Sequence, residues 1–249
     1  MRFFIELAYN GTAYHGWQIQ PQATTVQETI EKALSTLLRQ PVEIVGSGRT
    51  DTGVHAEQQF AHFDTQDRFD PVQLVYRLNK LLPPDIAIRQ IVEVPAQLHA
   101  RFDATYRKYE YRICRRKSPF LPNMAYFFER PLDVALMNQA AQKLLQYNDF
   151  QSFSLVNTQV YTFDCTITEA HWLTQGDMLV FHIKANRFLR GMVRAIVGTL
   201  LDVGLGKRPV ATFDDIILAK DRRKAGQAAP PEGLFLTEVG YPSNAWGNP

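Results

Sequence analysis

The sequence predicts an α+β fold in which antiparallel sheets carry helices on one face. Segments rich in aromatic and branched apolar residues, which are typical of strands, occur in both halves of the 249-residue chain. Segments with the apolar spacing of amphipathic helices lie between them. Strands and helices do not alternate strictly, as the βαβ units of a parallel sheet would require. This irregular order favours antiparallel pairing in each half.

The first half is predicted to contain strands at residues 2–9, 42–45, 58–63 and 86–94. Its first helix is expected to begin after Thr25, which can form a capping box with Glu28, and to end at Pro41. Its second helix should run over residues 71–82, with Asp70 as the N-cap.

The second half is predicted to contain strands at residues 106–114, 163–173, 178–185 and 234–239, and helices at 133–145, 188–203 and 212–220. The strands at 163–173 and 178–185 would form a hairpin around Gly176-Asp177. We place the boundary between the halves so that an N-terminal α+β lobe spans residues 1–104 and a C-terminal α+β lobe spans residues 105–249.

The composition and the missing motifs exclude several classes of protein. The chain has only two cysteines, Cys114 and Cys165, which are too few for a disulfide scaffold or a common structural zinc site. HExxH, P-loop and GxGxxG motifs are missing, so we expect neither a metal nor a nucleotide cofactor. No signal peptide or membrane-spanning segment is recognised, and we expect a soluble, cytoplasmic protein with no membrane partner.

The net charge is only +2, but the basic residues gather in three runs. Residues 101–117 hold seven cations, residues 184–194 hold four without a carboxylate, and residues 207–224 hold six. Arginines outnumber lysines 18 to 9, and arginine suits bidentate bonds to phosphate. Any single run would also fit a solvated face. Because aromatic residues lie among these runs, together they favour an RNA partner.

The densest cluster of unusual residues is the loop at 46–56, where three glycines fall within eight positions between two predicted strands. The carboxylate of Asp51 would be positioned there by the scaffold, and Arg49 could keep it ionised by charge pairing. An ionised, oriented aspartate can act as a nucleophile or a general base. The alternative is a hairpin in which Asp51 caps its own turn.

Two further residues could take part in chemistry. Tyr109 lies in the sequence RKYEYR, at 107–112, and an aromatic side chain between cations suits stacking on a base. A tyrosine of the sheet core is the alternative, which we prefer for Tyr111. Arg194 lies in the apolar helix predicted at 188–203, where an arginine needs a partner. Asp51 is one such partner, and an arginine that reaches the surface is the alternative.

The chain resembles the tRNA pseudouridine synthase A family almost from end to end. The most specific segment is GRTDTGVHA at 48–56, which is similar to the active-site signature of that family. The other matching segments are YHGWQ at 14–18, VQE at 26–28, HARF at 99–102, RKY at 107–109, Asn186 and Phe188, MVR at 192–194 and PEGL at 231–234. So many segments in the same order make a chance similarity improbable.

The resemblance implies an enzyme that isomerises uridine to pseudouridine at positions 38, 39 and 40 in the anticodon stem and loop of tRNA, without a metal or organic cofactor. It implies two similar lobes whose antiparallel sheets join into one extended sheet, with helices on the outer face and the active-site cleft between the lobes. It further implies a homodimer. The residue matching the nucleophile is Asp51, which would attack the sugar or act through a glycal intermediate.

The resemblance also assigns roles to other residues. Arg49 and Arg194 would orient Asp51 or fill the opening left by the flipped base, and Tyr109 would stack on that base. The substrate-binding residues would be Tyr109, His55, Arg101, Arg107 and Leu234.

Some positions depart from the family pattern, and two other functions stay open. Thr52 stands where the family often has alanine, and Arg187 and Gly191 also differ from it, which puts RNA contacts in doubt. A non-catalytic tRNA-binding or folding module would use the same basic surface. A nucleosidase or glycosidase would need a second carboxylate, and the nearest in sequence is Glu57.

Overall fold

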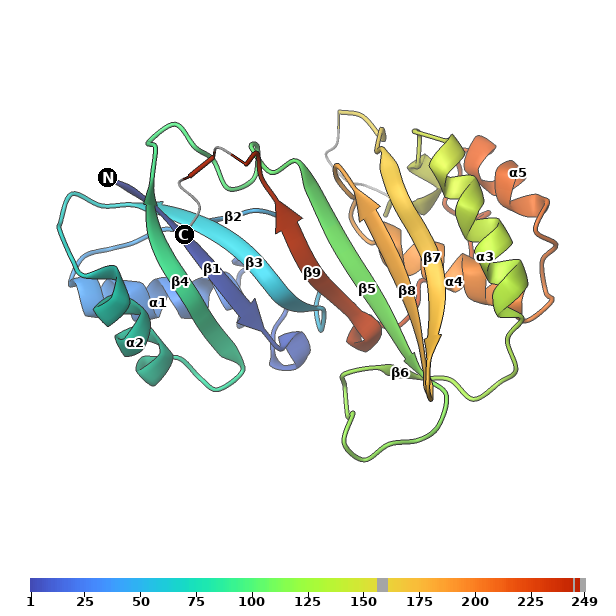
Figure 1. Ribbon diagram of the computed structural model, residues 1–249, viewed down its shortest axis with the longest axis horizontal. Coiled ribbons are helices and arrows are strands. Elements are labelled where there is room, and N and C mark those ends of the chain that lie inside the picture. The colour runs from blue at the N-terminus through green and yellow to red at the C-terminus, as the bar shows by residue number, and fades with distance from the viewer. Residues whose placement is uncertain (156–160, 244, 247–249) are drawn as a thin grey trace. The chain divides into compact units, whose positions relative to one another are not determined.

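The computed structural model describes residues 1–155, 161–243 and 245–246 (Figure 1). The chain forms two compact units, one of Met1–Thr105 with Leu236–Pro249 and one of Tyr106–Phe235. The sequence analysis assigned all of residues 105–249 to a C-terminal lobe. In the structure the segment from Leu236, which includes most of strand β9 (Leu234–Gly240), groups with the first unit. There the N–H of Val239 donates to Gln58 Oε1 at 3.0 Å, and the Tyr241 hydroxyl donates to the carbonyl oxygen of Ala100 at 2.6 Å.

The sheet of the first unit is centred on β1 (Arg2–Tyr9), which pairs antiparallel with β3 (His55–Asp64) and β4 (Ile86–Val94). In this register Ile5 lies opposite Ala61 in β3 and Ile91 in β4. All three side chains are buried, so they form one row of the core.

Two helices complete the first unit, and both were predicted. Helix α1 (Val26–Leu38) begins at the predicted cap, where the Thr25 hydroxyl accepts the N–H of Glu28. It ends at Arg39, which adopts a left-handed conformation with φ of 56°, rather than at Pro41. Helix α2 (Pro71–Leu81) begins at Asp70 and packs against α1 and β4.

The strand predicted at residues 42–45 is wrong except at its last residue. The structure has only a short strand β2 (Val45–Gly46), which pairs with β3. The reason lies in α1, whose side chains take the backbone groups that a strand partner would need. The N–H of Val42 donates to Ser35 Oγ at 3.0 Å, and the N–H of Ile44 donates to Glu31 Oε1 at 2.9 Å.

The sheet of the second unit contains β5 (Tyr106–Cys114), β8 (Met178–Ala185) and β7 (Ile167–Gln175), in that order. The hairpin of β7 and β8 is confirmed, although β7 begins later than predicted. Tyr111, Phe181 and Trp172 lie side by side across the three strands and are buried. A short strand β6 (Tyr126–Phe127) was not predicted, and it pairs with β5 in parallel, so the expectation of purely antiparallel pairing is wrong there.

Three helices belong to the second unit: α3 (Val134–Lys143), α4 (Met192–Gly204) and α5 (Thr212–Leu218). Helix α4 begins four residues later than predicted, because Gly191 before it has φ of 70°, which no helix residue adopts. Although α4 is apolar on nearly all sides, no helix in the described ranges is long and apolar enough to cross a membrane.

The cap of α2 gives a first testable expectation. Asp70 Oδ1 accepts the N–H groups of Val72 at 2.9 Å and Gln73 at 3.3 Å. Asp70→Ala should lower the free energy of unfolding by about 1 kcal/mol, because those two donors lose their acceptor. Asp70→Asn keeps an acceptor oxygen and should cost only a few tenths of that. Urea denaturation measures both, and equal losses in the two variants would show that the cap is not the cause.

Candidate active site

Asp51 begins a tight turn in the loop between β2 and β3. Its carbonyl oxygen accepts the N–H of Val54 at 3.1 Å, and Gly53, the third residue of the turn, has the positive φ of 76° that such turns favour. A turn capped by Asp51 itself would direct the Gly53 N–H to the Asp51 carboxylate. That N–H donates instead to the carbonyl oxygen of Tyr14, at 3.2 Å. The half-buried Asp51 side chain therefore belongs to a turn whose backbone is fixed by a hydrogen bond to Tyr14, a residue outside the turn.

The loop is also fixed on the side preceding Asp51. Gln59, fully buried in β3, accepts a hydrogen bond from Ser47 Oγ and donates one to the carbonyl oxygen of Gly48 at 3.0 Å. The hydroxyl groups of Tyr9 and Thr50 are hydrogen-bonded at 2.8 Å, and both residues are buried. Buried polar side chains with satisfied partners hold a backbone in one position. The sequence analysis did not identify Gln59 or Tyr9 as supports of the loop.

The segment YHGWQ supports the loop from behind. Gly16 has φ of 85°, and a Cβ atom at that position would lie 2.4 Å from the carbonyl oxygen of Thr50. The same oxygen accepts the N–H of Trp17 at 3.3 Å. A Cβ atom on Gly46 would lie 2.4 Å from the indole of Trp17. Only glycine allows these close approaches, so this segment determines where the Asp51 loop lies.

His55 is the first residue of β3 and is almost completely buried. Its Nδ1 atom accepts the N–H of Gly11 at 3.1 Å. A Cβ atom on Gly11 would lie 2.0 Å from the carbonyl oxygen of Val54, so the chain is tightly packed on this side of the loop as well. These contacts explain a structural role for His55, and its contact with substrate stays a prediction.

Arg49 and Arg101 are exposed in the first unit. The segment around Arg101 is anchored through Ala100, whose N–H donates to His62 Nδ1 at 3.2 Å and whose carbonyl oxygen accepts from the Tyr241 hydroxyl at 2.6 Å. The Arg101 guanidinium lies 5.5 Å from the ring centre of Phe102, which is 74% exposed. An exposed aromatic ring beside an arginine suits stacking on an RNA base. The sequence analysis quoted Phe102 in a motif but did not propose it as a site residue.

The environment of His62 disfavours its protonated form. Burial lowers the pKa of His62 to about 4, and the positive charges of Arg2 and His99 act in the same direction. The rings of His62 and His99 meet edge to face, 4.6 Å apart. A neutral His62 can keep Nδ1 as an acceptor, which the anchored N–H of Ala100 requires.

In the second unit, Tyr109 lies in the middle of β5, opposite Ile183 of β8. Its half-buried ring meets that of Phe188 edge to face, with the ring centres 5.2 Å apart. Arg107, two residues earlier in β5, donates from Nη1 to the carbonyl oxygen of Asn186 at 3.0 Å. Tyr109 and Arg107 are thus held beside the chain that leads from β8 to α4.

Arg194 lies in the first turn of α4 and is half-buried. Its Nε atom donates to the carbonyl oxygen of Ala229 at 2.7 Å, and the N–H of Ala229 donates back to the carbonyl oxygen of Arg194 at 2.9 Å. A guanidinium has five N–H donors in a fixed plane. The reciprocal bond therefore sets the orientation of that plane, a constraint that the sequence did not reveal.

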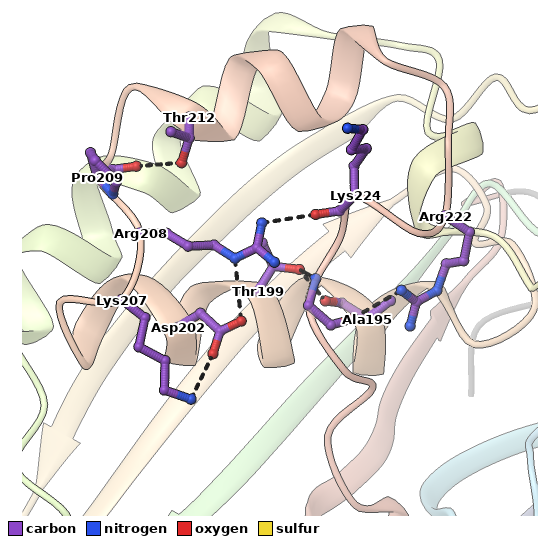
Figure 2. Close-up of polar contacts among 10 residues, drawn as sticks. Ala195, Thr199, Asp202, Lys207, Arg208, Pro209, Thr212, Arg222 and Lys224 are labelled. Carbon is purple, nitrogen blue, oxygen red and sulfur yellow. Dashed lines mark hydrogen bonds and ion pairs between the residues drawn. The ribbon is translucent and has the colours of Figure 1, made fainter.

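The segment before Ala229 packs directly against the backbone of α4 at Gly198. A Cβ atom on Gly198 would lie 1.7 Å from the carbonyl oxygen of Gln227. Thr199 Oγ1 accepts the N–H of Gly226 at 2.8 Å and donates to the carbonyl oxygen of Ala195 at 2.8 Å (Figure 2). This segment continues to the buried Leu234 at the start of β9. The structure thus connects Leu234 with Arg194 through one packed segment of chain.

The predicted site residues are distributed over both units. Asp51, Arg49, His55 and Arg101 belong to the first unit, and Tyr109, Arg107, Arg194 and Leu234 belong to the second. Among the described residues, no three His, Cys, Asp or Glu side chains gather so that they could hold a metal ion.

Comparisons with known proteins give a consistent picture. A family model described as "tRNA pseudouridine synthase" matches residues 7–103 and 140–242. This range includes Asp51 and Arg194 but not Tyr109 or Arg107. A protein of Parabacteroides distasonis named tRNA pseudouridine synthase A is 52% identical over 97% of this chain and 96% of its own length.

Proteins of the same name from other bacteria are also similar. The protein of Porphyromonas gingivalis is 52% identical over 98% of both chains, and that of Exiguobacterium sibiricum is 40% identical over 99% of both. A solved structure described as "Crystal structure of a CRISPR-associated protein from thermus thermophilus" covers 82% of this chain and 97% of its own, at 13% identity and a TM-score of 0.22. That similarity is too weak to support an argument.

The packing behind the Asp51 loop predicts a large difference between two glycine substitutions. Gly16→Ala should lower the free energy of unfolding by at least about 2 kcal/mol, because a side chain there is strained and meets the backbone of Thr50. Gly48→Ala is the control, since no atom lies within 4 Å of its added Cβ. It should change stability by less than about 0.5 kcal/mol. Thermal unfolding measures both, and similar losses would contradict the role of Gly16.

His62 predicts a dependence of stability on pH. Its pKa is about 4 in the folded chain, against an ordinary value of 6.5, so the unfolded chain binds the proton first as the pH falls. The contribution of His62 to stability is therefore complete above pH 6.5 and is lost as the pH falls toward 4. His62→Asn keeps an acceptor for the N–H of Ala100. Its Tm should fall less than that of the wild type between about pH 7 and about pH 5. Equal falls would contradict this assignment.

Proposed function

The chain belongs to the tRNA pseudouridine synthase family, and from this membership we propose how its residues perform the reaction. It is an isomerase that converts uridine to pseudouridine in tRNA. We propose that Asp51 is its nucleophile and that the target uridines are at positions 38, 39 and 40 of the anticodon stem and loop.

The observation that supports Asp51 is the rigidity of its turn. The carbonyl of Tyr14 holds the N–H of Gly53 at 3.2 Å, and Trp17 donates to the carbonyl of Thr50 at 3.3 Å. The backbone is therefore fixed on both sides of the carboxylate. Catalysis requires a reacting group that is already oriented, because each misplaced ångström costs rate.

The proposed reaction replaces an N–C bond by a C–C bond and moves one proton from C5 to N1 by exchange with solvent, with no net change in atoms. The bond between N1 of uracil and C1′ of the ribose breaks, while the uracil stays bound. Asp51 either attacks C1′ or acts through a glycal intermediate. The ring then rotates and C5 bonds to C1′. Where Asp51 has formed an ester with C1′, that ester bond breaks at this step and the carboxylate is released. The proton on C5 is then lost as N1 gains one.

The other predicted residues would act on the base and on Asp51. The target base must leave its stack before the reaction, since its reacting atoms are otherwise enclosed. Tyr109 would stack on the extruded base. Arg194 would orient Asp51 or fill the opening left in the RNA, and Arg49 would act beside it. Exposed residues such as Arg101 and Phe102 would contact the surrounding RNA.

This function requires residues of both units, which supports a finer proposal about the fold. We propose that the sheets of two similar lobes join into one, with the helices on the outer face and Asp51, Tyr109 and Arg194 meeting in a cleft between the lobes. We also propose a homodimer that acts in the cytoplasm. Free Cys114 and Cys165 support a reducing compartment.

The test uses tRNA transcripts that carry tritium at C5 of uridine. The wild type should release tritium from sites in the anticodon stem and loop, because C5 exchanges its proton for a bond to C1′. Asp51→Asn should lower the rate at least about 10³-fold, since the amide can neither attack nor accept a proton. Its affinity for tRNA should stay within about threefold of the wild type, because the surface contacts to the RNA do not involve this carboxylate.

Each alternative predicts a different outcome of the same experiment. Tight tRNA binding without tritium release by the wild type would indicate a non-catalytic binding module. Release of free uracil would indicate a glycosidase instead of an isomerase. Full activity of Asp51→Asn would show that another residue is the nucleophile.

A further inference from the structure

The residues that hold the Asp51 turn are themselves held by an aspartate outside it. Asp85 lies in the connection between α2 and β4 and is half-buried. Its backbone carbonyl oxygen accepts the N–H of Asn10 at 2.9 Å, and its carboxylate accepts the Tyr14 hydroxyl at 2.7 Å. Asp85 thus holds both ends of the chain at 10–14, which we refer to as the 10–14 segment.

The 10–14 segment is a compact turn with its own hydrogen bonds. A single 3-10 turn spans Gly11–Ala13. Asn10 Oδ1 accepts both the N–H of Thr12 at 3.0 Å and its hydroxyl at 2.6 Å. Such local bonds give a short turn one defined shape, so its position depends on what holds its ends.

Two hydrogen bonds join this segment to the Asp51 turn. The N–H of Gly53 donates to the carbonyl oxygen of Tyr14 at 3.2 Å, and the N–H of Gly11 donates to His55 Nδ1 at 3.1 Å. Gly53 and His55 follow Asp51 by two and four residues. The 10–14 segment therefore holds the chain directly after the carboxylate.

Tyr14 connects the two sets of contacts through a buried ring. It is 4% exposed, its hydroxyl contacts Asp85, and its backbone carbonyl oxygen holds Gly53. Burial raises the pKa of Tyr14, and the hydrogen bond to Asp85 and the charge of that carboxylate act in the same direction. The hydroxyl therefore stays protonated, and it donates to a charged acceptor, which makes a stronger bond than a neutral one.

The need of a buried hydroxyl for an acceptor would by itself explain the contact of Tyr14 with Asp85. It does not explain why Asp85 also holds Asn10, at the other end of the same segment. Both hydrogen bonds of Asp85 act on the part of the chain that supports the Asp51 turn. A role limited to stability and a role in placing that turn predict different effects on the reaction.

We propose that Asp85 is a positioning residue for the reaction, which acts through Tyr14 to keep the turn of Asp51 in the orientation that the chemical step requires. This inference rests on the proposed role of Asp51 and deepens it, because Asp85 lies outside every motif that identified the site. Asp85 does not touch the reacting atoms. Its loss should therefore misplace the Asp51 carboxylate and lower kcat, while the affinity for tRNA is retained.

The test compares the two aspartates that flank α2. Asp85→Ala removes the acceptor of the Tyr14 hydroxyl but keeps the backbone carbonyl that holds Asn10, and Asp85→Asn keeps a side-chain oxygen that can accept from Tyr14. Asp70→Ala and Asp70→Asn are the matched controls, because the Asp70 carboxylate caps α2 and does not hold the 10–14 segment. The Tm of each variant is measured first, and all assays are run well below the lowest value.

Asp85→Ala should lower kcat for pseudouridine formation about tenfold, with the dissociation constant for tRNA within about twofold of the wild type. Asp85→Asn should restore kcat to within about threefold of the wild type, because its amide oxygen is a weaker but correctly placed acceptor. Both Asp70 variants should keep kcat within about twofold, even where their Tm falls as far as that of Asp85→Ala.

Hydrogen exchange measures the turn without reference to activity. The amide of Gly53 should exchange about tenfold faster in Asp85→Ala than in the wild type, and at the wild-type rate in Asp70→Ala. Mass spectrometry of the peptide that contains Gly53 follows this exchange.

A double variant tests whether Asp85 acts through Tyr14. Tyr14→Phe removes the same hydrogen bond from its other side and keeps the buried ring. Tyr14→Phe combined with Asp85→Ala should have a kcat within about twofold of Asp85→Ala alone, because both changes remove one bond.

Equal losses of kcat in Asp85→Ala and Asp70→Ala would overturn the proposal, because they would show a general effect of lost stability. An unchanged kcat in Asp85→Ala, a loss of kcat without faster exchange at Gly53, or additive losses in the double variant would overturn it as well. Asp51→Asn is assayed beside these variants. Its full activity would overturn the proposed nucleophile, whereas an inactive Asp51→Asn beside an unaffected Asp85→Ala would overturn only the role of Asp85.

Discussion

The position of Asp51 depends on the contact of two backbones. Gly16 lies against the carbonyl oxygen of Thr50 so closely that no side chain fits between them. Trp17 then bonds to the same oxygen and fills the space beside Gly46. The Asp51 side chain is only half-buried, so its own burial contributes little to the order of the loop. Its order must come from neighbouring chain, and here a second loop supplies it through glycine.

The second unit repeats this principle at Arg194. Because Gly198 has no side chain, the segment that contains Gln227 can lie against α4. This placement allows Ala229 and Arg194 to form their reciprocal hydrogen bonds. In both units a glycine without a Cβ atom allows a loop to approach a residue that the sequence predicts for the site. Such positions appear in the sequence only as glycines inside motifs. Each of these glycines allows two backbone segments that are far apart in the sequence to lie close together.

Local chemistry explains why much of the fold could be predicted. Aromatic and branched apolar residues predicted β1, alternation predicted β5, and the caps at Thr25 and Asp70 predicted where α1 and α2 begin. The strand expected at 42–45 failed because Ser35 and Glu31 of α1 take its N–H groups. Strand β6, which pairs with β5 in parallel, was not predicted because two residues are too few to show a recognisable pattern.

The sequence by itself determined the candidate residues, since GRTDTGVHA and the other motifs name Asp51, Tyr109 and Arg194 as chemical groups in a fixed order. It also determined the family through the similarity of nearly the whole chain. Only the tertiary structure decided which groups support them. It buried His55, exposed Phe102, and gave Lys207, Arg208, Lys220 and Arg223 of the last basic run carboxylate partners. Burial and charge pairing are properties of contacts between distant segments, and a linear pattern does not contain them.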